Sequence, residues 1–267
     1  MHRIPILPIL TALIALPLMA QTSVIRPSGT APATETASFP LQNGGRLNVS
    51  NVNGDIKVTA WDKEEVALTA RFKPDSDQQH ARIEIESKPR ALELVVKHPD
   101  NKKYRRGRSA SCEMELKVPR HIICDMNNVN GSIFLKAIIG EHKSRTVNGS
   151  IVLENTDGRT NATTVNGAVV LESVNGQILT STVNGTIKGS VRNVEDNLDI
   201  STTNGNIDIK LLNPNGTIKI STFRGSAKLL TPGAKNIEAG KKSVKAQFAD
   251  GTAIMTFKSF NGSVVVR

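Results

Sequence analysis

The most concentrated group of charged side chains in the sequence is the basic run Lys102-Lys-Tyr-Arg-Arg-Gly-Arg108. It places five positive charges around the only tyrosine, in a chain whose formal net charge is +10. A basic surface accumulates anionic partners. The partner that we expect is an anionic envelope polymer or lipid surface, bound by Lys102, Lys103, Tyr104, Arg105, Arg106 and Arg108. The competing interpretation is a solvated loop between two strands.

The chemistry available to cysteine and histidine is limited. Cys112 and Cys124 are the only cysteines. An exported protein permits a disulfide, so two interpretations remain open, a Cys112–Cys124 bridge or two buried free thiols. A metal site is not expected, because the five histidines are scattered and no Cys-x-x-Cys pair occurs. No cofactor is expected either.

The carboxylates do not form a catalytic group. Glycoside cleavage needs clustered carboxylates on one face, whereas the acids between residues 129 and 230 are few and dispersed. Calcium-binding repeats need an acid in nearly every turn, and in this region only Asp157 precedes a glycine. A column of threonines three residues before the glycines is explained by β-propensity and by hydroxyls that flank turns. We expect no enzymatic activity; the alternative is a carbohydrate-active β-helix enzyme, a polysaccharide lyase or hydrolase.

These residues are set in a repeat that runs from Val129 to Ala227. The motif Val-Asn-Gly-Ser-Ile, or a close variant, recurs every eighteen residues up to Val183, and glycines recur every nine residues from Gly131 to Gly185. Alternating apolar residues after each glycine predict short strands, and the Asn-Gly pairs predict bends between them. The sequence therefore predicts an all-β fold, a parallel β-solenoid (β-helix) with roughly 18–20-residue coils, capped by an irregular β N-terminal region.

Equivalent residues of such a stack lie about 4.8 Å apart and form columns. We expect Val147, Val165 and Val183 to form one column of the core. The second and fourth residues after each glycine form the other inward columns, with Ile133, Leu135, Ile151, Leu153, Val169 and Leu171. The asparagines serve the bends, and the alternative is an inward ladder of amides that stabilises the stack.

The chain divides into five segments. Residues 1–20 have the charged start, apolar run and small final residue of a signal peptide. Residues 21–38, rich in Thr, Ala, Pro and Ser, predict a flexible linker. We expect an N-terminal β region that acts as a cap over 39–128, regular solenoid coils over 129–230, and C-terminal coils with a second cap over 231–267. The predicted signal peptide leads us to expect an exported protein, either periplasmic, cell-surface or extracellular, that meets no intracellular nucleic acid. No transmembrane segment is expected in the mature chain.

The order of the motifs adds a resemblance to a known family. An Asn53-Gly-Asp-Ile56 copy of the repeat is followed by Trp61, by the segment Leu116-Lys-Val-Pro-Arg120 and then by the Val-Asn-Gly coils. This order resembles the bacterial putative-adhesin domain family of unknown function, found in YvlB-like exported proteins. The resemblance covers residues 40–267 and implies a β-solenoid in an envelope setting, without catalytic residues. The resulting hypothesis is a non-catalytic, adhesin-like interaction or scaffold module at the cell envelope.

Overall fold

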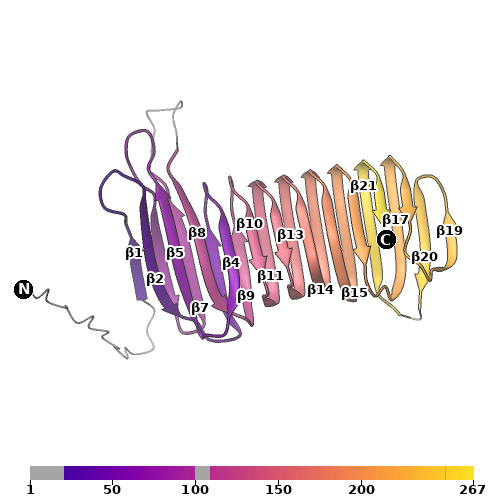
Figure 1. Ribbon diagram of the computed structural model, residues 1–267, viewed down its shortest axis with the longest axis horizontal. Helices are drawn as coiled ribbons and strands as arrows, with labels where there is room; N and C mark the ends of the chain where they lie inside the picture. The colour runs from indigo at the N-terminus through magenta and orange to yellow at the C-terminus, as the bar shows by residue number, and fades with distance from the viewer. Residues whose placement is uncertain (1–20, 100–108, 250) are drawn as a thin grey trace, which may run out of the picture.

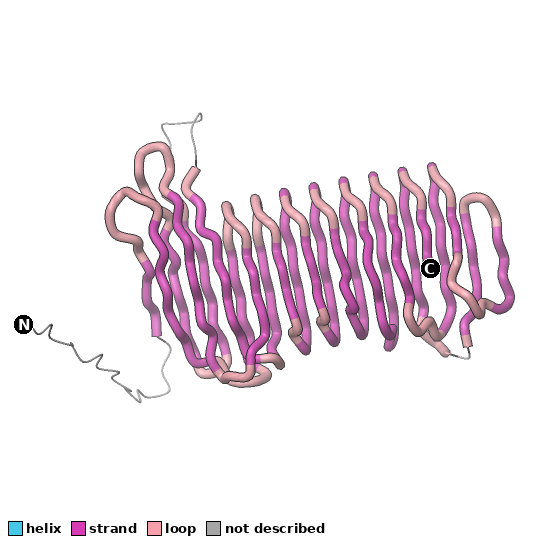
Figure 2. Tube along the Cα trace, viewed as in Figure 1, coloured by secondary structure: helices cyan, strands magenta, loops and turns pink. Residues whose placement is uncertain are grey.

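The computed structural model describes residues 21–99, 109–249 and 251–267. Over these ranges the chain forms 22 strands and no helix, which confirms the all-β prediction. The strands run across the long axis of an elongated molecule, with loops along its two edges (Figures 1 and 2). The described part of the chain contains no helix of the length and hydrophobicity needed to cross a membrane.

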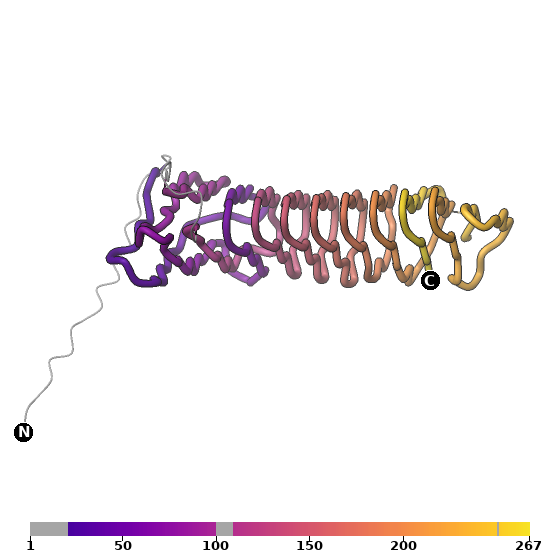
Figure 3. Tube along the Cα trace, turned by 90° about the horizontal axis from the view of Figure 1, so that it is seen from above, coloured from indigo at the N-terminus to yellow at the C-terminus, as the bar shows by residue number. Residues whose placement is uncertain are grey.

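The strands pair into two ladders that form the two sides of the stack (Figure 3). In spatial order, the first ladder contains β1 (Gln21–Ile25), β6 (Arg82–Lys88), β7 (Ala91–Lys97), β3 (Gly45–Ser50), β9 (Ile122–Asn127), β11 (Ile139–Asn148), β13 (Asp157–Asn166), β14 (Val169–Asn184), β15 (Ile187–Asn204), β21 (Ile254–Asn261), β17 (Gly216–Arg224), β20 (Ser243–Phe248) and β19 (Lys235–Ala239).

The second ladder contains, in the same sense, β2 (Ala33–Pro40), β5 (Glu65–Lys73), β8 (Ser111–Pro119), β4 (Ile56–Trp61), β10 (Ile133–Lys136), β12 (Ile151–Glu154), β14, β15, β16 (Ile207–Leu211), β22 (Val264–Val266) and β18 (Ala227–Leu229). The long strands β14 and β15 begin in the second ladder and end in the first. They therefore join both ladders into one sheet.

The central strands pair in parallel and advance by one copy of the motif at each step. Ile133 pairs with Ile151 in the second ladder, and Thr146 pairs with Thr164 in the first. Both ladders also contain antiparallel pairs: β1, β6 and β7, and β2, β5 and β8, at the N-terminal end, and β17, β20 and β19 at the other. Strand direction is consequently mixed over the sheet as a whole.

One coil lies out of chain order. β21 pairs with both β15 and β17, and β22 pairs with both β16 and β18. Residues 254–266 are therefore inserted between two coils that precede them in the sequence. Figure 1 shows this as the yellow β21 between the orange β15 and β17. Stacking in simple chain order would instead bring β17 directly against β15.

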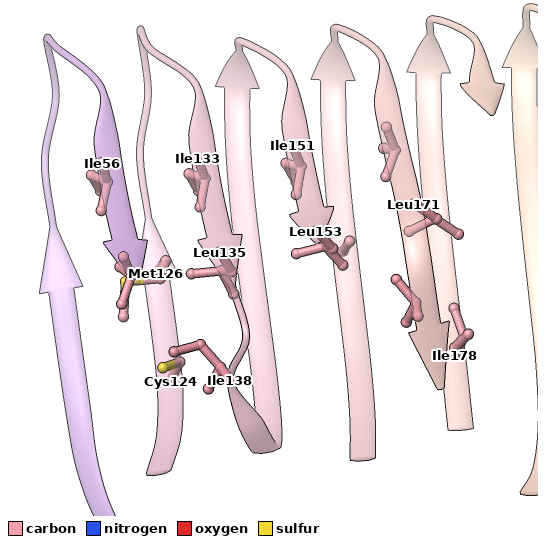
Figure 4. Packing of buried hydrophobic residues seen from close by; sticks show 14 of the residues in the cluster. Ile56, Cys124, Met126, Ile133, Leu135, Ile138, Ile151, Leu153, Leu171 and Ile178 are labelled. Carbon is pink, nitrogen blue, oxygen red and sulfur yellow. The ribbon is translucent and has the colours of Figure 1, made fainter. Parts of the chain in front are cut away.

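Aliphatic side chains fill the space between the ladders. Ile133, Leu135, Ile151 and Leu153 are fully buried, and Figure 4 shows them lined up across successive coils. Burying each such side chain contributes about 1.5–3 kcal/mol. Ser150, the neighbour of Ile151, is only half-buried. The predicted inward columns that follow each glycine are thus confirmed.

The prediction for the segment after the predicted signal peptide is wrong. Of residues 21–38, predicted as a flexible linker, Gln21–Ile25 pairs with β6, and residues 33–38 belong to Ala33–Pro40, which pairs with β5. A polar segment becomes ordered here because the outer edges of β5 and β6 offer unpaired backbone groups. The predicted signal peptide at residues 1–20 lies outside the described residues, and the other segment boundaries stay predictions.

Candidate functional site

The bend at the end of each central first-ladder strand is built from a repeated Thr-Val-Asn-Gly sequence. The threonine points inward and donates its hydroxyl to a glycine carbonyl of the neighbouring coil. Thr146 donates to Gly131 at 2.9 Å, and Thr164 to Gly149 at 2.8 Å. The same bond recurs at Thr182, Thr202, Thr222 and Ser259. A buried hydroxyl needs such a partner, so this column holds coils together.

Glycine is required at the bend because consecutive coils touch there. A Cβ atom at Gly149 would collide with the carbonyl oxygen of Gly131, and one at Gly167 with that of Gly149. The side chain would therefore force the two backbones apart. The glycines that recur every nine residues in the sequence therefore stand where the backbones of adjacent coils come close together.

The asparagines of the bends form a continuous ladder of amides. From Asn130 onward, each Nδ2 donates to the Oδ1 of the asparagine on the adjacent coil nearer the N-terminal end, at 2.8–2.9 Å. The ladder runs through Asn53, Asn130, Asn148, Asn166, Asn184, Asn204 and Asn261. The amide-ladder alternative is correct in its hydrogen bonds and wrong in its direction, because these bonds lie on the surface.

The valines that precede these asparagines are exposed, which corrects the prediction that they belong to the core. The exposed fraction of these side chains and of two equivalent phenylalanines ranges from 37% to 56%. We call them the rim row; in spatial order it comprises Val52, Val129, Val147, Val165, Val183, Phe260 and Phe223. The prediction failed because the bend places Val and Asn outward in succession, so the two-residue alternation does not continue across it.

A groove follows the rim row over the C-terminal half of the stack. Its volume is about 590 Å³, and its lining combines rim-row side chains with hydroxyl groups. Hydroxyls line it at Thr163, Ser181 and Ser201 on the consecutive strands β13, β14 and β15, and at Ser221 on β17, beyond Lys258 of β21. The groove is therefore amphipathic along its length.

Aromatic and cationic side chains meet at the distal end of the groove. The rings of Phe223 and Phe260 stack with centroids 4.8 Å apart and planes inclined by 13°. Lys242 Nζ lies 5.6 Å from the Phe223 ring centroid, and Arg224 Cζ lies 6.0 Å from it. Both distances fit cation–π attraction. Lys258 also lines the groove.

The two cysteines are buried free thiols, which decides between the two interpretations that the sequence left open and rejects the Cys112–Cys124 bridge. Cys112 lies on β8 of the second ladder and Cys124 on β9 of the first. Burial raises the pKa of each thiol to about 12, which leaves both protonated at neutral pH. Their strands belong to opposite sides of the stack.

Two acidic side chains of the second ladder lie next to each other within the described ranges. Glu154 and Glu172 stand in register on neighbouring strands, and Glu154 pairs with Lys136 at 2.6 Å. Among the described residues, no group of three or more His, Cys, Asp and Glu is placed to hold a metal ion. The basic run from Lys102 to Arg108 lies outside the described residues.

No protein-family model and no curated protein matches the chain. Solved structures with a similar fold include a putative cell adhesion protein from Clostridium sporogenes, with 13% identity, a TM-score of 0.43, and coverage of 88% of this chain and 98% of that one. A putative adhesin from Bacteroides fragilis has 12% identity and a TM-score of 0.37, and the match covers 91% of this chain and 100% of that one. A putative lipid binding protein from Parabacteroides distasonis has 10% identity and a TM-score of 0.31, and the match covers 88% of this chain and 96% of that one. These likenesses are too distant to carry a functional argument.

Proposed function

We propose that this protein is a non-catalytic, adhesin-like interaction or scaffold module, exported to the cell envelope and built as a parallel β-solenoid. One observation carries the proposal, the exposed rim row. An apolar side chain stands at the same outward position of nearly every coil, beside a groove. Contiguous exposed apolar surface on a soluble protein marks an interaction site.

The rim row is held in a fixed geometry. The amide ladder and the threonine–glycine bonds connect each coil to the next. Neighbouring rim-row side chains therefore keep the spacing of adjacent strands, about 4.8 Å. A surface that is already ordered loses little entropy when a partner binds. The repeated spacing of the rim row therefore favours an extended partner that contacts several coils at once.

The lining of the groove favours binding over cleavage, the alternative function. A polysaccharide lyase or hydrolase needs carboxylates, or a carboxylate with a cation, at the cleaved bond. The described residues that line the groove are hydroxyl-bearing and apolar, together with Lys258, and include no carboxylate. We therefore place the carbohydrate-active enzyme second.

The solenoid description is supported by the eighteen-residue step of the central parallel pairs. The proposed localisation rests on the signal-like sequence of residues 1–20. It is periplasmic, cell-surface or extracellular. Assignment to the YvlB-like group stays a prediction from the order of the motifs.

Retention of the protein on isolated envelope fractions tests the proposal. We expect a variant carrying Val147→Thr, Val165→Thr and Val183→Thr to lose at least about tenfold in retention, because interface energy concentrates in a few apolar anchors. The matched control is Val152→Thr with Val170→Thr, which changes half-buried valines of the second ladder. The control should bind like the parent chain. Equal retention of the rim-row variant and the parent contradicts the proposal.

The basic run is proposed as a second contact with anionic polymers or lipid surfaces. One arm of the same experiment replaces Lys102, Lys103, Arg105, Arg106 and Arg108 by Ser. Retention that depends on these residues falls as salt is raised to about 0.5 M, where the Debye length is only a few Å. If the Ser variant is retained as well as the parent at low salt, the run is a solvated loop.

A further inference from the structure

Three cations surround the aromatic end of the groove without an ion pair. Arg224, Lys242 and Lys258 are exposed, and none forms a salt bridge with another described residue. Some cations elsewhere on the stack are paired, as Lys136 is with Glu154 at 2.6 Å, so what sets these three apart is their position together around the aromatic end of the groove. A cluster of like charges without ion-pair partners attracts a ligand of the opposite sign.

The surrounding surface has the same sign. Residues 216–267 contain nine Lys and Arg against two Asp and Glu. Lys219 and Lys245 stand directly opposite each other on β17 and β20, an arrangement that disfavours the free surface. Glu238, at 3.9 Å from Lys245, compensates only part of this charge. An anionic ligand would relieve the remaining repulsion.

The groove leading to this cluster is lined along its length by hydroxyl groups. Thr163, Ser181 and Ser201 occupy equivalent positions on consecutive strands, and Lys258 and Ser221 continue the same row. The row repeats at the strand spacing, about 4.8 Å, which is close to the length of one sugar ring along a glycan chain. Hydroxyl groups both donate and accept hydrogen bonds, so the row can pair with a polymer that also carries hydroxyls.

We propose that this groove binds a linear acidic polysaccharide, whose carboxylates or sulfates meet Lys258, Lys242 and Arg224. The inference rests on the proposed function and names the partner class for that site. Sugar rings lie along the hydroxyl row, with their C–H faces against Val165, Val183 and the exposed edges of the phenylalanines. The rings at the distal end bring their acidic groups to the three cations.

The same geometry disfavours two other anionic partners. Single-stranded nucleic acid binds by stacking its bases on open aromatic faces. Here Phe223 and Phe260 stack on each other, and Lys242 and Arg224 lie over the Phe223 ring. A lipid bilayer presents a hydrocarbon interior, whereas most of the described residues that line the groove are serines and threonines. Such a lining pairs better with a polymer that carries hydroxyl groups.

Calorimetric titration with oligogalacturonate tests the inference. The full chain should bind this probe, and a neutral dextran oligosaccharide of equal length should not bind. Lys242→Gln combined with Lys258→Gln should weaken binding at least about tenfold, and about 0.5 M salt should have a similar effect on the parent. The matched control is Lys188→Gln with Lys210→Gln, which changes exposed lysines of the second ladder. Its affinity should equal that of the parent.

Three results overturn the inference. They are equal binding of the dextran, equal affinity of the Lys242/Lys258 variant and the parent, and binding of phosphatidylglycerol vesicles or poly(dT) without binding of oligogalacturonate. Melting temperatures confirm that the variants, which change only exposed side chains, remain folded.

If envelope retention still depends on the rim row while oligogalacturonate does not bind, only the polysaccharide inference fails. If the titration succeeds but rim-row variants keep full retention, it is the proposed function that fails.

Discussion

At the scale of single residues, the inward threonines of the bends stand where their hydroxyls find a partner inside the stack. Threonine suits the bend because its hydroxyl reaches a glycine carbonyl on the adjacent coil. His142 is an ionisable side chain at such a position, only 1% exposed, with Nε2 3.0 Å from the carbonyl oxygen of Asp157. Burial lowers the pKa of His142, against the opposing effect of that carbonyl. The imidazole is therefore neutral in the folded protein.

The buried imidazole predicts a loss of stability in acid. The folded pKa lies below that of the unfolded chain, so below about pH 6.5 the unfolded state binds the extra proton, and stability falls by up to about 1.4 kcal/mol per pH unit. His142→Met removes this contribution. Urea unfolding of both proteins at about pH 7.5 and pH 5.5 measures it. We expect a smaller acid-induced loss in the variant. Equal losses would show that His142 does not couple folding to pH.

At the scale of the strand and its bend, the amide ladder is the recurring element. Asn166 donates to Asn148 and accepts from Asn184, both at 2.9 Å. These bonds lie on the surface, where water competes with them. Each is therefore worth about 0.5–1.5 kcal/mol net, and the ladder matters through repetition rather than through any single pair.

Removing one rung should have a small but measurable cost. Asn166→Ala loses two hydrogen bonds, and we expect it to reduce the free energy of unfolding by about 1–2 kcal/mol. The matched control is Asn197→Ala on β15, where the exposed side chain makes no hydrogen bond to other described residues. Chemical denaturation of both variants measures the difference. A cost at Asn166 no larger than that at Asn197 would mean that the ladder does not stabilise the stack.

At the scale of the whole molecule, the inserted coil decides how the distal end is held. β21 and β22 bury Met255, Phe257, Val264 and Val266 between coils that precede them in the sequence. Without this coil, the strand edges of β15 and β17 would both be unpaired. The last residues of the chain thus join the cap to the rest of the stack.

The inserted coil predicts that the cap depends on one buried aromatic side chain. Phe257→Ala should cost about 3–5 kcal/mol through loss of a buried ring. Phe260→Ala changes the same strand at a position that is 50% exposed, so it should cost no more than about 1.5 kcal/mol. Thermal unfolding with limited proteolysis compares the two. Similar melting temperatures, or cleavage confined to the N-terminal half, would contradict this role of the coil.

The sequence by itself determined the β fold, the positions of the bends and the inward columns after each glycine, because these depend on local periodicity and on turn-forming residues. It did not determine which way Val147 points, since the bend places two outward residues in succession. It also did not reveal the order of the coils or the Phe223–Phe260 pair, whose members are 37 residues apart in sequence. Those features depend on which strand edge is free when the last coil docks, and only the tertiary structure decides that.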